Sequence, residues 1–169
     1  MGAAPVVSEK REAVGLSDDE FLRQFEAGTL PYVHWTHRAH LRVAYLYITQ
    51  YGLDGAIPKV TAGIRAYNQS QKIEDTPTSG YHETMTVAWL HIVAAMLAEY
   101  GPTGAITHGA PRILEPDAPL SQEFLAAQTH LHEKKLLRLF YSRERFMSPE
   151  AKYNFLPPDL APFPRTTPR

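Results

Sequence analysis

Apolar side chains recur every three or four residues along most of this 169-residue chain. In the segment that follows Thr36, for example, Leu41, Tyr45 and Ile48 fall on one face of a helix. This period is typical of α-helices packed against a core. No segment alternates apolar and polar residues cleanly, as a strand on a half-buried sheet does. The pattern therefore predicts an all-α fold, a single compact bundle of five to six helices.

Capping residues place the ends of these helices. Ser17 and Glu20 form a capping box for a first helix, in which Ser17 accepts from the third amide and Glu20 reaches back. Thr36 is the expected N-cap of a central helix that ends at Gly52. The further helices are predicted over residues 54–72, over 81–100, over 121–140 with a break near 130–133, and from Pro149 after an N-cap at Ser148.

The two ends of the chain differ in composition from its helical middle. Residues 1–15 are small, charged and aperiodic, which predicts a flexible or loosely docked N-terminal arm. Residues 157–169 contain five of the fourteen prolines, which prevents a helix and predicts an extended tail over the surface. Residues 16–156 then form one helical domain. A long loop is expected near 101–120, and loops of that length often serve function.

Composition excludes several classes of function. A net charge of −1 without a basic run argues against a nucleic-acid partner. No stretch approaches the roughly 20 apolar residues of a membrane span, which argues against a membrane partner. The chain has no cysteine, so disulfide scaffolds and thiolate chemistry are excluded, and nitrogen and oxygen atoms must hold any metal ion. We therefore expect a cytoplasmic protein.

Two short histidine-containing segments stand where central helices should begin. They are residues 34–40, with three histidines spaced three apart, and residues 80–86, in which a histidine precedes a glutamate. His37 and His40 lie one turn apart on the same helix face. In a bundle of alternating direction the two helices that follow these segments are parallel, so their starts lie at the same end. The two segments are therefore expected to form one polar site.

Imidazole nitrogens and a carboxylate in one place suit Zn²⁺, Fe²⁺ or Mn²⁺. The predicted ligands of such a divalent metal ion are His37, His40, His82 and Glu83. Glu83 and His82 are also the candidate catalytic residues, with Glu83 as the fourth ligand or as a general base. Side chains that could donate hydrogen bonds to a bound small molecule are those of Tyr81, Thr84 and Thr86.

Two other interpretations of the same histidines are open. The positively polarised starts of two helices favour an anion and lower the pKa of nearby histidines, so the site can bind a small molecule without any cofactor. The histidines can also be structural, bonded to backbone carbonyls or to Glu83. The spacing of His37 and His40 arises readily by chance in a chain with eight histidines.

The interpretation we favour is a small cytoplasmic enzyme with a His/Glu site at the starts of two central helices. A hydrolytic, an isomerising and an oxygen-dependent reaction all fit such a site. The alternative is a non-catalytic module that binds a small molecule or a protein, with structural histidines. In that case the tyrosine-rich helix faces form a groove or a dimer seam, so a homo-oligomer is left open.

Several segments resemble a family of uncharacterised bacterial all-helical proteins. The similarity is most specific at Thr36-His37-Arg38-Ala39-His40-Leu41-Arg42-Val43-Ala44 and at Tyr81-His82-Glu83-Thr84-Met85-Thr86, and it extends to residues 25–30 and 140–159. The resemblance covers most of residues 20–160. It implies a single helical domain in which His37, His40, His82 and Glu83 are the positions of interest, and it implies no activity.

Overall fold

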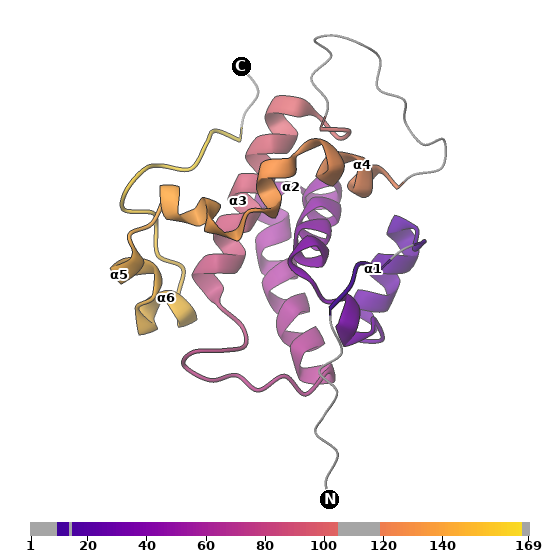
Figure 1. Cartoon of the computed structure of the whole chain (residues 1–169), viewed down its shortest axis with the longest axis horizontal. Helices are drawn as coiled ribbons and strands as arrows, with labels where there is room; N and C mark the ends of the chain where they lie inside the picture. Colours follow the sequence, from indigo (N-terminus) through magenta and orange to yellow (C-terminus); the bar gives the residue numbers. More distant parts are fainter. Residues whose placement is uncertain (1–9, 14, 105–118, 167–169) are drawn as a thin grey trace, which may run out of the picture.

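A computed structural model describes residues 10–13, 15–104 and 119–166 of the chain. Within these ranges the chain is helical, with no strand and a single isolated bridge between Thr76 and Ser79. The all-α prediction is therefore confirmed. The α-helices are α1 (Asp18–Glu26), α2 (His37–Ser70), α3 (Glu83–Tyr100), α4 (Leu120–Ala127), α5 (Arg143–Phe146) and α6 (Pro149–Tyr153), and 3₁₀ helices lie at Tyr32–His34, Thr129–His132 and Lys134–Leu139 (Figure 1).

Helix α2 consists of two arms that fold back on each other at Gly52. Gly52 has φ 71° and ψ 172°, a conformation open almost only to glycine, and it interrupts the helical backbone where the sequence predicted the central helix to end. We call residues 37–51 the first arm and residues 53–70 the second arm. The ring of Trp35 lies 4.5 Å from that of Tyr67, so the second arm ends beside the start of the first.

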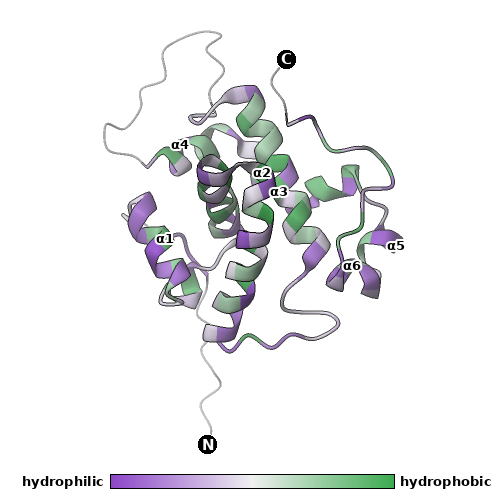
Figure 2. Cartoon of the chain, turned by 180° about the vertical axis from the view of Figure 1, so that it is seen from behind, coloured by the Kyte–Doolittle hydropathy of each residue, from purple (hydrophilic) through white to green (hydrophobic). Residues whose placement is uncertain are grey.

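Helix α3 packs along α2 and forms the centre of the core with it. Leu41 and Val43 of the first arm and Leu90 and Val93 of α3 are at most 1% exposed. Burying a side chain of this size contributes about 1.5–3 kcal/mol. Figure 2 shows apolar residues along α3 and the adjoining part of α2, whereas polar residues dominate the outer helix α1. Since α1 covers only one side of α2, its apolar residues are limited to one face, that of Phe21 and Phe25.

Three predicted N-caps are confirmed by hydrogen bonds. The hydroxyl of Ser17 accepts from the amide of Glu20, and the hydroxyls of Thr36 and Ser148 accept in the same way at the starts of α2 and α6. The half of the capping box that Glu20 was expected to supply is not formed. The Glu20 carboxylate accepts from Arg23 and Gln24 on the next turn, so it does not reach back to Ser17.

The helix predicted over 121–140 is divided into α4 and two 3₁₀ helices. The break falls at Gln128, earlier than predicted, where the backbone leaves helical geometry (φ −94°, ψ 62°). The Gln128 side chain is buried and donates to the Gly104 carbonyl at 2.7 Å, a tertiary contact that competes with helix continuation. Most of the loop predicted near 101–120 lies outside the described residues.

The described parts of both chain ends contact the helical domain. Residues 10–13 lie against the segment before α2, where the Arg11 amide donates to the Val33 carbonyl at 2.8 Å and Ala13 is buried. After α6 the described chain has no further helix, and the ring of Phe163 stacks on that of His91 at 4.8 Å. None of the described helices combines the length and the apolarity needed to cross a membrane.

Replacing Gly52 by alanine should destabilise the protein, because a Cβ atom is strained at φ 71° even though no neighbouring atom lies within 4 Å of its place. We expect the free energy of unfolding to fall by about 1–3 kcal/mol. The measurement is urea denaturation followed by far-UV circular dichroism. The exposed residue Gln50, on the preceding turn, provides the control Gln50→Ala, which should change stability little. Equal stabilities of the Gly52→Ala variant and the wild type would contradict this account of the turn.

Candidate functional site

The imidazole of His40 is held by two contacts at the start of α2. Its Nδ1 lies 2.7 Å from the backbone carbonyl oxygen of Thr36, one turn earlier. Its ring packs on the indole of Trp35 with ring centroids 3.9 Å apart, and Trp35 itself is only 3% exposed. Since a carbonyl can only accept, Nδ1 carries the proton. The other nitrogen, Nε2, then presents a lone pair, and it has no hydrogen-bond partner among the described residues.

His37 is fixed in a similar way from the other side of the site. Its Nε2 donates to the Leu131 carbonyl at 2.9 Å, so its lone pair lies on Nδ1. Its ring meets the edge of Trp89 of α3, with centroids 4.8 Å apart. We call His37 and His40 the histidine pair. Helix periodicity places both on one face of α2, as predicted, and each is held by a backbone carbonyl.

Burial keeps both rings of the histidine pair neutral. Desolvation is the main cause that lowers the pKa of His40, to about 4, and the positive charges of Lys10 and Lys134 lower it further. Desolvation also lowers the pKa of His37, with Lys134 and His132 adding to the effect. The hydrogen bonds to the two carbonyls act in the opposite direction but do not prevail. At neutral pH the pair is therefore uncharged, and each ring offers one nitrogen lone pair as a hydrogen-bond acceptor or ligand.

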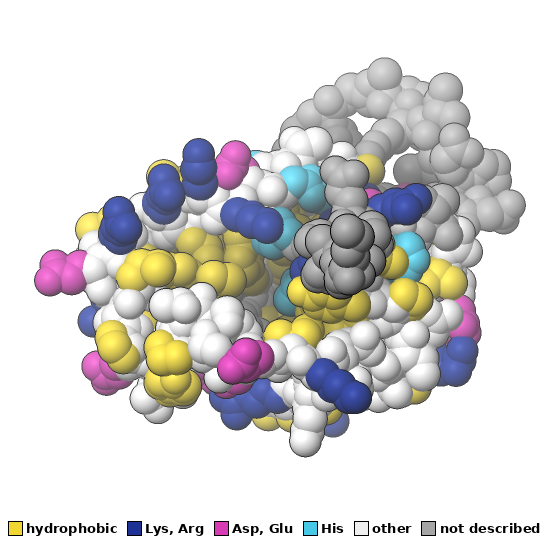
Figure 3. All heavy atoms as spheres, turned by 60° about the horizontal axis from the view of Figure 1, so that its bottom comes forward, with side chains coloured by type: hydrophobic (Ala, Val, Ile, Leu, Met, Phe, Trp, Pro, Cys, Tyr) yellow, Lys and Arg dark blue, Asp and Glu magenta, His cyan; other side chains and the backbone are white. Residues whose placement is uncertain are grey.

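Polar side chains border the histidine pair. Arg38 donates to the side chain of Gln122 on α4 at 2.9 Å and lies 3.3 Å from Nε2 of His132. Glu12 lies 3.7 Å from Arg38 and accepts from the hydroxyl of Thr36 at 3.2 Å. Figure 3 shows a face of the molecule on which several histidine and basic side chains lie among apolar ones.

His82 serves as the N-cap of α3. Its Nδ1 accepts from the amide of Met85 at 3.1 Å, and its ring stacks on Phe146 with centroids 5.1 Å apart. Burial lowers the pKa of His82, which keeps the ring in the neutral form that this cap requires. Because the cap uses the Nδ1 lone pair, the remaining nitrogen of the neutral ring carries the proton. In this arrangement His82 has no lone pair left for a metal ion.

Glu83 is paired within the start of α3. Its Oε2 accepts from the Tyr81 hydroxyl at 2.7 Å and from Arg65 of the second arm at 3.0 Å. The guanidinium of Arg65 also lies over the Tyr81 ring, 4.5 Å from its centroid. Burial, followed by the contact with Glu83, raises the pKa of Tyr81, so its hydroxyl remains a donor. The carboxylate thus links α3 to the second arm of α2.

The two predicted ligand-binding threonines have backbone partners. Thr84 is fully buried, donates to the Asn154 carbonyl at 2.8 Å and accepts from the Leu156 amide at 3.1 Å. Thr86 donates to the His82 carbonyl at 2.9 Å. Both hydroxyls therefore hold the protein backbone, Thr84 by joining α3 to the chain after α6.

The structure does not bring the four predicted metal ligands into one group. His37 contacts Trp89, which lies seven residues and therefore about 10 Å along α3 from His82. Within the described ranges no three histidine, aspartate or glutamate side chains are placed to hold a metal ion. The two helix starts were expected to lie side by side. Instead, α3 begins about two turns before Trp89, the residue that contacts His37.

Two buried basic residues that the sequence did not single out organise these segments. Lys152 of α6 is 5% exposed and donates to the Asp75 carboxylate at 2.7 Å and to the carbonyls of Ser79 and Tyr81 at 2.9 and 2.5 Å. It thereby fixes the loop that leads into α3. Nothing in its short polar helix indicates burial.

The second residue is Arg42 of α2, which is 1% exposed and donates to Asp18 and to the Leu16 carbonyl at 2.9 and 2.8 Å. Its Nε also donates to the Ser121 hydroxyl at 3.0 Å, so it joins the starts of α1 and α4. Its position, five residues after His37 in a mainly apolar stretch, is the one signal of burial that the sequence offers.

Comparisons of this chain with protein-family models, with curated proteins and with solved structures find no match.

The lowered pKa of His40 predicts that the protein loses stability in mild acid. The pKa of His40 is about 4 in the folded protein and 6.5 at its ordinary value. As the pH falls from 6.5 towards 4, the unfolded chain takes up a proton at this residue before the folded protein does, so the free energy of unfolding decreases. The loss from this residue amounts to about 3 kcal/mol. Urea denaturation at several pH values should show a smaller loss for His40→Gln than for the wild type. The exposed His130 supplies the control His130→Gln, and identical pH dependence in all three proteins would contradict the prediction.

Replacing Lys152 by methionine should destabilise the loop that leads into α3. The substitution keeps the length of the side chain but leaves two carbonyls without their buried donor, which costs about 2–4 kcal/mol. We expect a lower unfolding midpoint and faster amide hydrogen exchange at residues 75–82. Lys135→Met, at an exposed position, is the matched control. Unchanged exchange in this loop would show that Lys152 does not hold it.

Proposed function

We propose that the histidine pair is the binding and acid–base site of a small enzyme. The observation that carries the proposal is the arrangement of His40, a partly buried neutral imidazole whose Nδ1 proton is held by the Thr36 carbonyl. A ring held in this way presents Nε2 to a ligand in a fixed orientation and a fixed tautomer. Both properties are requirements for proton transfer and for directional binding.

In this proposal His40 acts as a general base whose basicity depends on the bound ligand. Without a ligand, the His40 ring has a pKa of about 4, so it accepts hydrogen bonds but takes up a proton only weakly. A negatively charged group beside it would raise that pKa towards neutrality, where proton transfer is most effective. His37, one turn away, supplies a second neutral nitrogen. In this proposal His82 and Glu83 shape the start of α3 rather than meet the reacting atoms.

A divalent metal ion bound by the histidine pair is the second candidate. It is favoured by one observation, the hydrogen bond from Nδ1 of His40 to a backbone carbonyl, which is the orienting contact found behind many metal-binding histidines. Two imidazoles would leave further positions of the ion for water or substrate. Elemental analysis of protein purified without a tag, before and after addition of zinc, iron or manganese, distinguishes the metal-dependent form from the metal-free form.

Diethyl pyrocarbonate, which acylates unprotonated imidazole nitrogens, tests the proposed reactivity of His40. We expect modification at Nε2 with a rate that stays constant between pH 7.5 and 5.5, because the ring is already deprotonated throughout. The rate for N-acetylhistidine amide should fall roughly tenfold over the same range, since its pKa is near 6.5. Mass spectrometry of the peptide that contains His40 gives the rate, with His40→Gln as the blank. A His40 that reacts only after unfolding, or whose rate falls in parallel with the reference, would contradict the proposal and favour structural histidines.

A further inference from the structure

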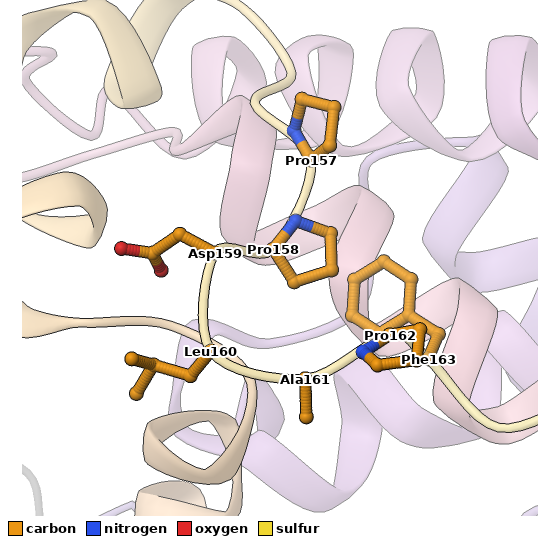
Figure 4. Close-up of a pocket in the computed structure, with 7 residues that line it drawn as sticks. All are labelled: Pro157, Pro158, Asp159, Leu160, Ala161, Pro162 and Phe163. Carbon is orange, nitrogen blue, oxygen red and sulfur yellow. The ribbon is translucent and has the colours of Figure 1, made fainter.

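The chain after α6 bends around a shallow apolar pocket on the surface. Residues 157–163 line the pocket, which has a volume of about 450 Å³. Figure 4 shows the rings of Pro158 and Phe163 on the inner side of the bend, whereas Asp159 and Leu160 point outward. Four of the seven lining residues are exposed. Walls this exposed do not enclose a small molecule, so the pocket is suited to a single apolar side chain of a larger partner.

Neighbouring elements fix this pocket and add apolar surface beside it. The Nε atom of Arg145 on α5 donates to the Pro157 carbonyl at 2.7 Å. The Leu160 amide donates to the Phe140 carbonyl at 2.9 Å, directly after the last 3₁₀ helix. This contact places Leu139 and Leu160 on adjoining segments, and their side chains are 63% and 59% exposed. An apolar pocket with further exposed apolar side chains next to it is typical of an interaction surface.

The segments that form this surface are basic, although the whole chain has a net charge of −1. Residues 134–146 and 155–166 contain two acidic and six basic residues. The basic residues are Lys134, Lys135, Arg138, Arg143, Arg145 and Arg165. Within the part of the chain that the structure describes, none of the six forms an ion pair. One of the two carboxylates, that of Asp159, accepts from the amide and the hydroxyl of Ser142, the N-cap of α5. An acidic partner therefore complements this surface.

We propose that this surface binds an acidic peptide segment of another protein. A large apolar side chain of the peptide enters the pocket beside Phe163, and carboxylates next to it pair with Arg145 and with the exposed Arg138 and Arg165. A second copy of this chain is disfavoured as the occupant, because the same basic surface on both sides of a two-fold interface brings like charges together. The proposal does not depend on the proposed function, since neither residue of the histidine pair lines the pocket.

The test uses the full chain at low ionic strength and labelled decapeptides, with binding followed by fluorescence anisotropy. The four probes are glutamate peptides with a central leucine, isoleucine, phenylalanine or tryptophan. One set of controls has lysines in place of the glutamates, and the other has serine at the centre. We expect at least one probe to bind at least roughly tenfold more tightly than both of its controls, because the pocket and the charges contribute separately. Added salt should weaken this binding.

A variant at Leu160 locates the peptide at the pocket. Leu160→Glu removes apolar lining and places a carboxylate there, while the backbone hydrogen bond of this residue is kept. The probe that binds the wild type should bind this variant at least roughly tenfold more weakly. The control is Leu120→Glu, at a leucine of α4 that is 51% exposed. This control should bind the probe like the wild type.

Charge-reversal variants test the contribution of the arginines. Arg138→Glu/Arg165→Glu should weaken binding of the probe at least roughly tenfold, since each arginine supplies a charge-assisted contact. The control Lys59→Glu/Lys72→Glu changes the net charge equally at two exposed lysines of other segments. It should bind the probe like the wild type.

Three results would overturn the proposal. They are no binding of any probe, equal binding of the probes and their serine controls, and equal losses in a variant and its control. If the peptides fail but vesicles with phosphatidylserine bind and Leu160→Glu abolishes that binding, the surface belongs to an anionic membrane instead. If the protein self-associates and Leu160→Glu abolishes the association, the occupant is a second copy.

Discussion

The buried ring of Trp35 connects the fold of this protein to its candidate site. It stacks on Phe25 of α1 with ring centroids 5.3 Å apart, and it packs at a tilt against Tyr67 of the second arm at 4.5 Å and against His40 of the first arm at 3.9 Å. The same indole therefore fixes the return of α2 on itself, the position of α1 and the orientation of an imidazole. Aromatic pairs of this kind add about 0.5–1.5 kcal/mol each beyond the area they bury. Loss of the stack would loosen the core and the histidine pair together.

Desolvation and neighbouring positive charges keep both rings of the histidine pair neutral. The two rings lie among basic groups and are desolvated, so both are neutral at a pH where exposed imidazoles begin to take up protons. The second polar cluster, around Glu83, has the opposite character, because its carboxylate is already bonded to Tyr81 and Arg65. A neutral imidazole with a lone pair on Nε2 can receive a ligand, whereas a carboxylate that is already bonded to two side chains holds helices in place. This difference is why the proposed function rests on the first cluster alone.

Much of the fold could be predicted because it depends on local chemistry. Ser17, Thr36 and Ser148 cap the helices they were expected to cap, and Gly52 ends the first arm through a conformation that needs glycine. A break within residues 121–140 was predicted, but its position at Gln128 was not. It depends on the contact of Gln128 with Gly104, which joins segments far apart in sequence.

The part of the candidate site that depends on local helix geometry could be predicted, and the part that depends on packing between helices could not. Helix periodicity places His37 and His40 on one face, but no periodicity determines how far α3 is displaced along α2. The displacement of two turns follows from the packing of Trp89 on His37 and separates His82 from the pair. Lys152 was missed because its role depends on tertiary contacts of a short, polar helix.

The candidate site depends on His40 being a neutral imidazole with its proton on Nδ1 and a lone pair on Nε2. A two-dimensional ¹⁵N NMR spectrum of the histidine rings at pH 7, with His40→Gln for assignment, reports this state directly. We expect a ¹⁵N shift for Nδ1 typical of a protonated nitrogen and one for Nε2 typical of an unprotonated nitrogen. A proton on Nε2, or an imidazolium with protons on both nitrogens, would contradict it.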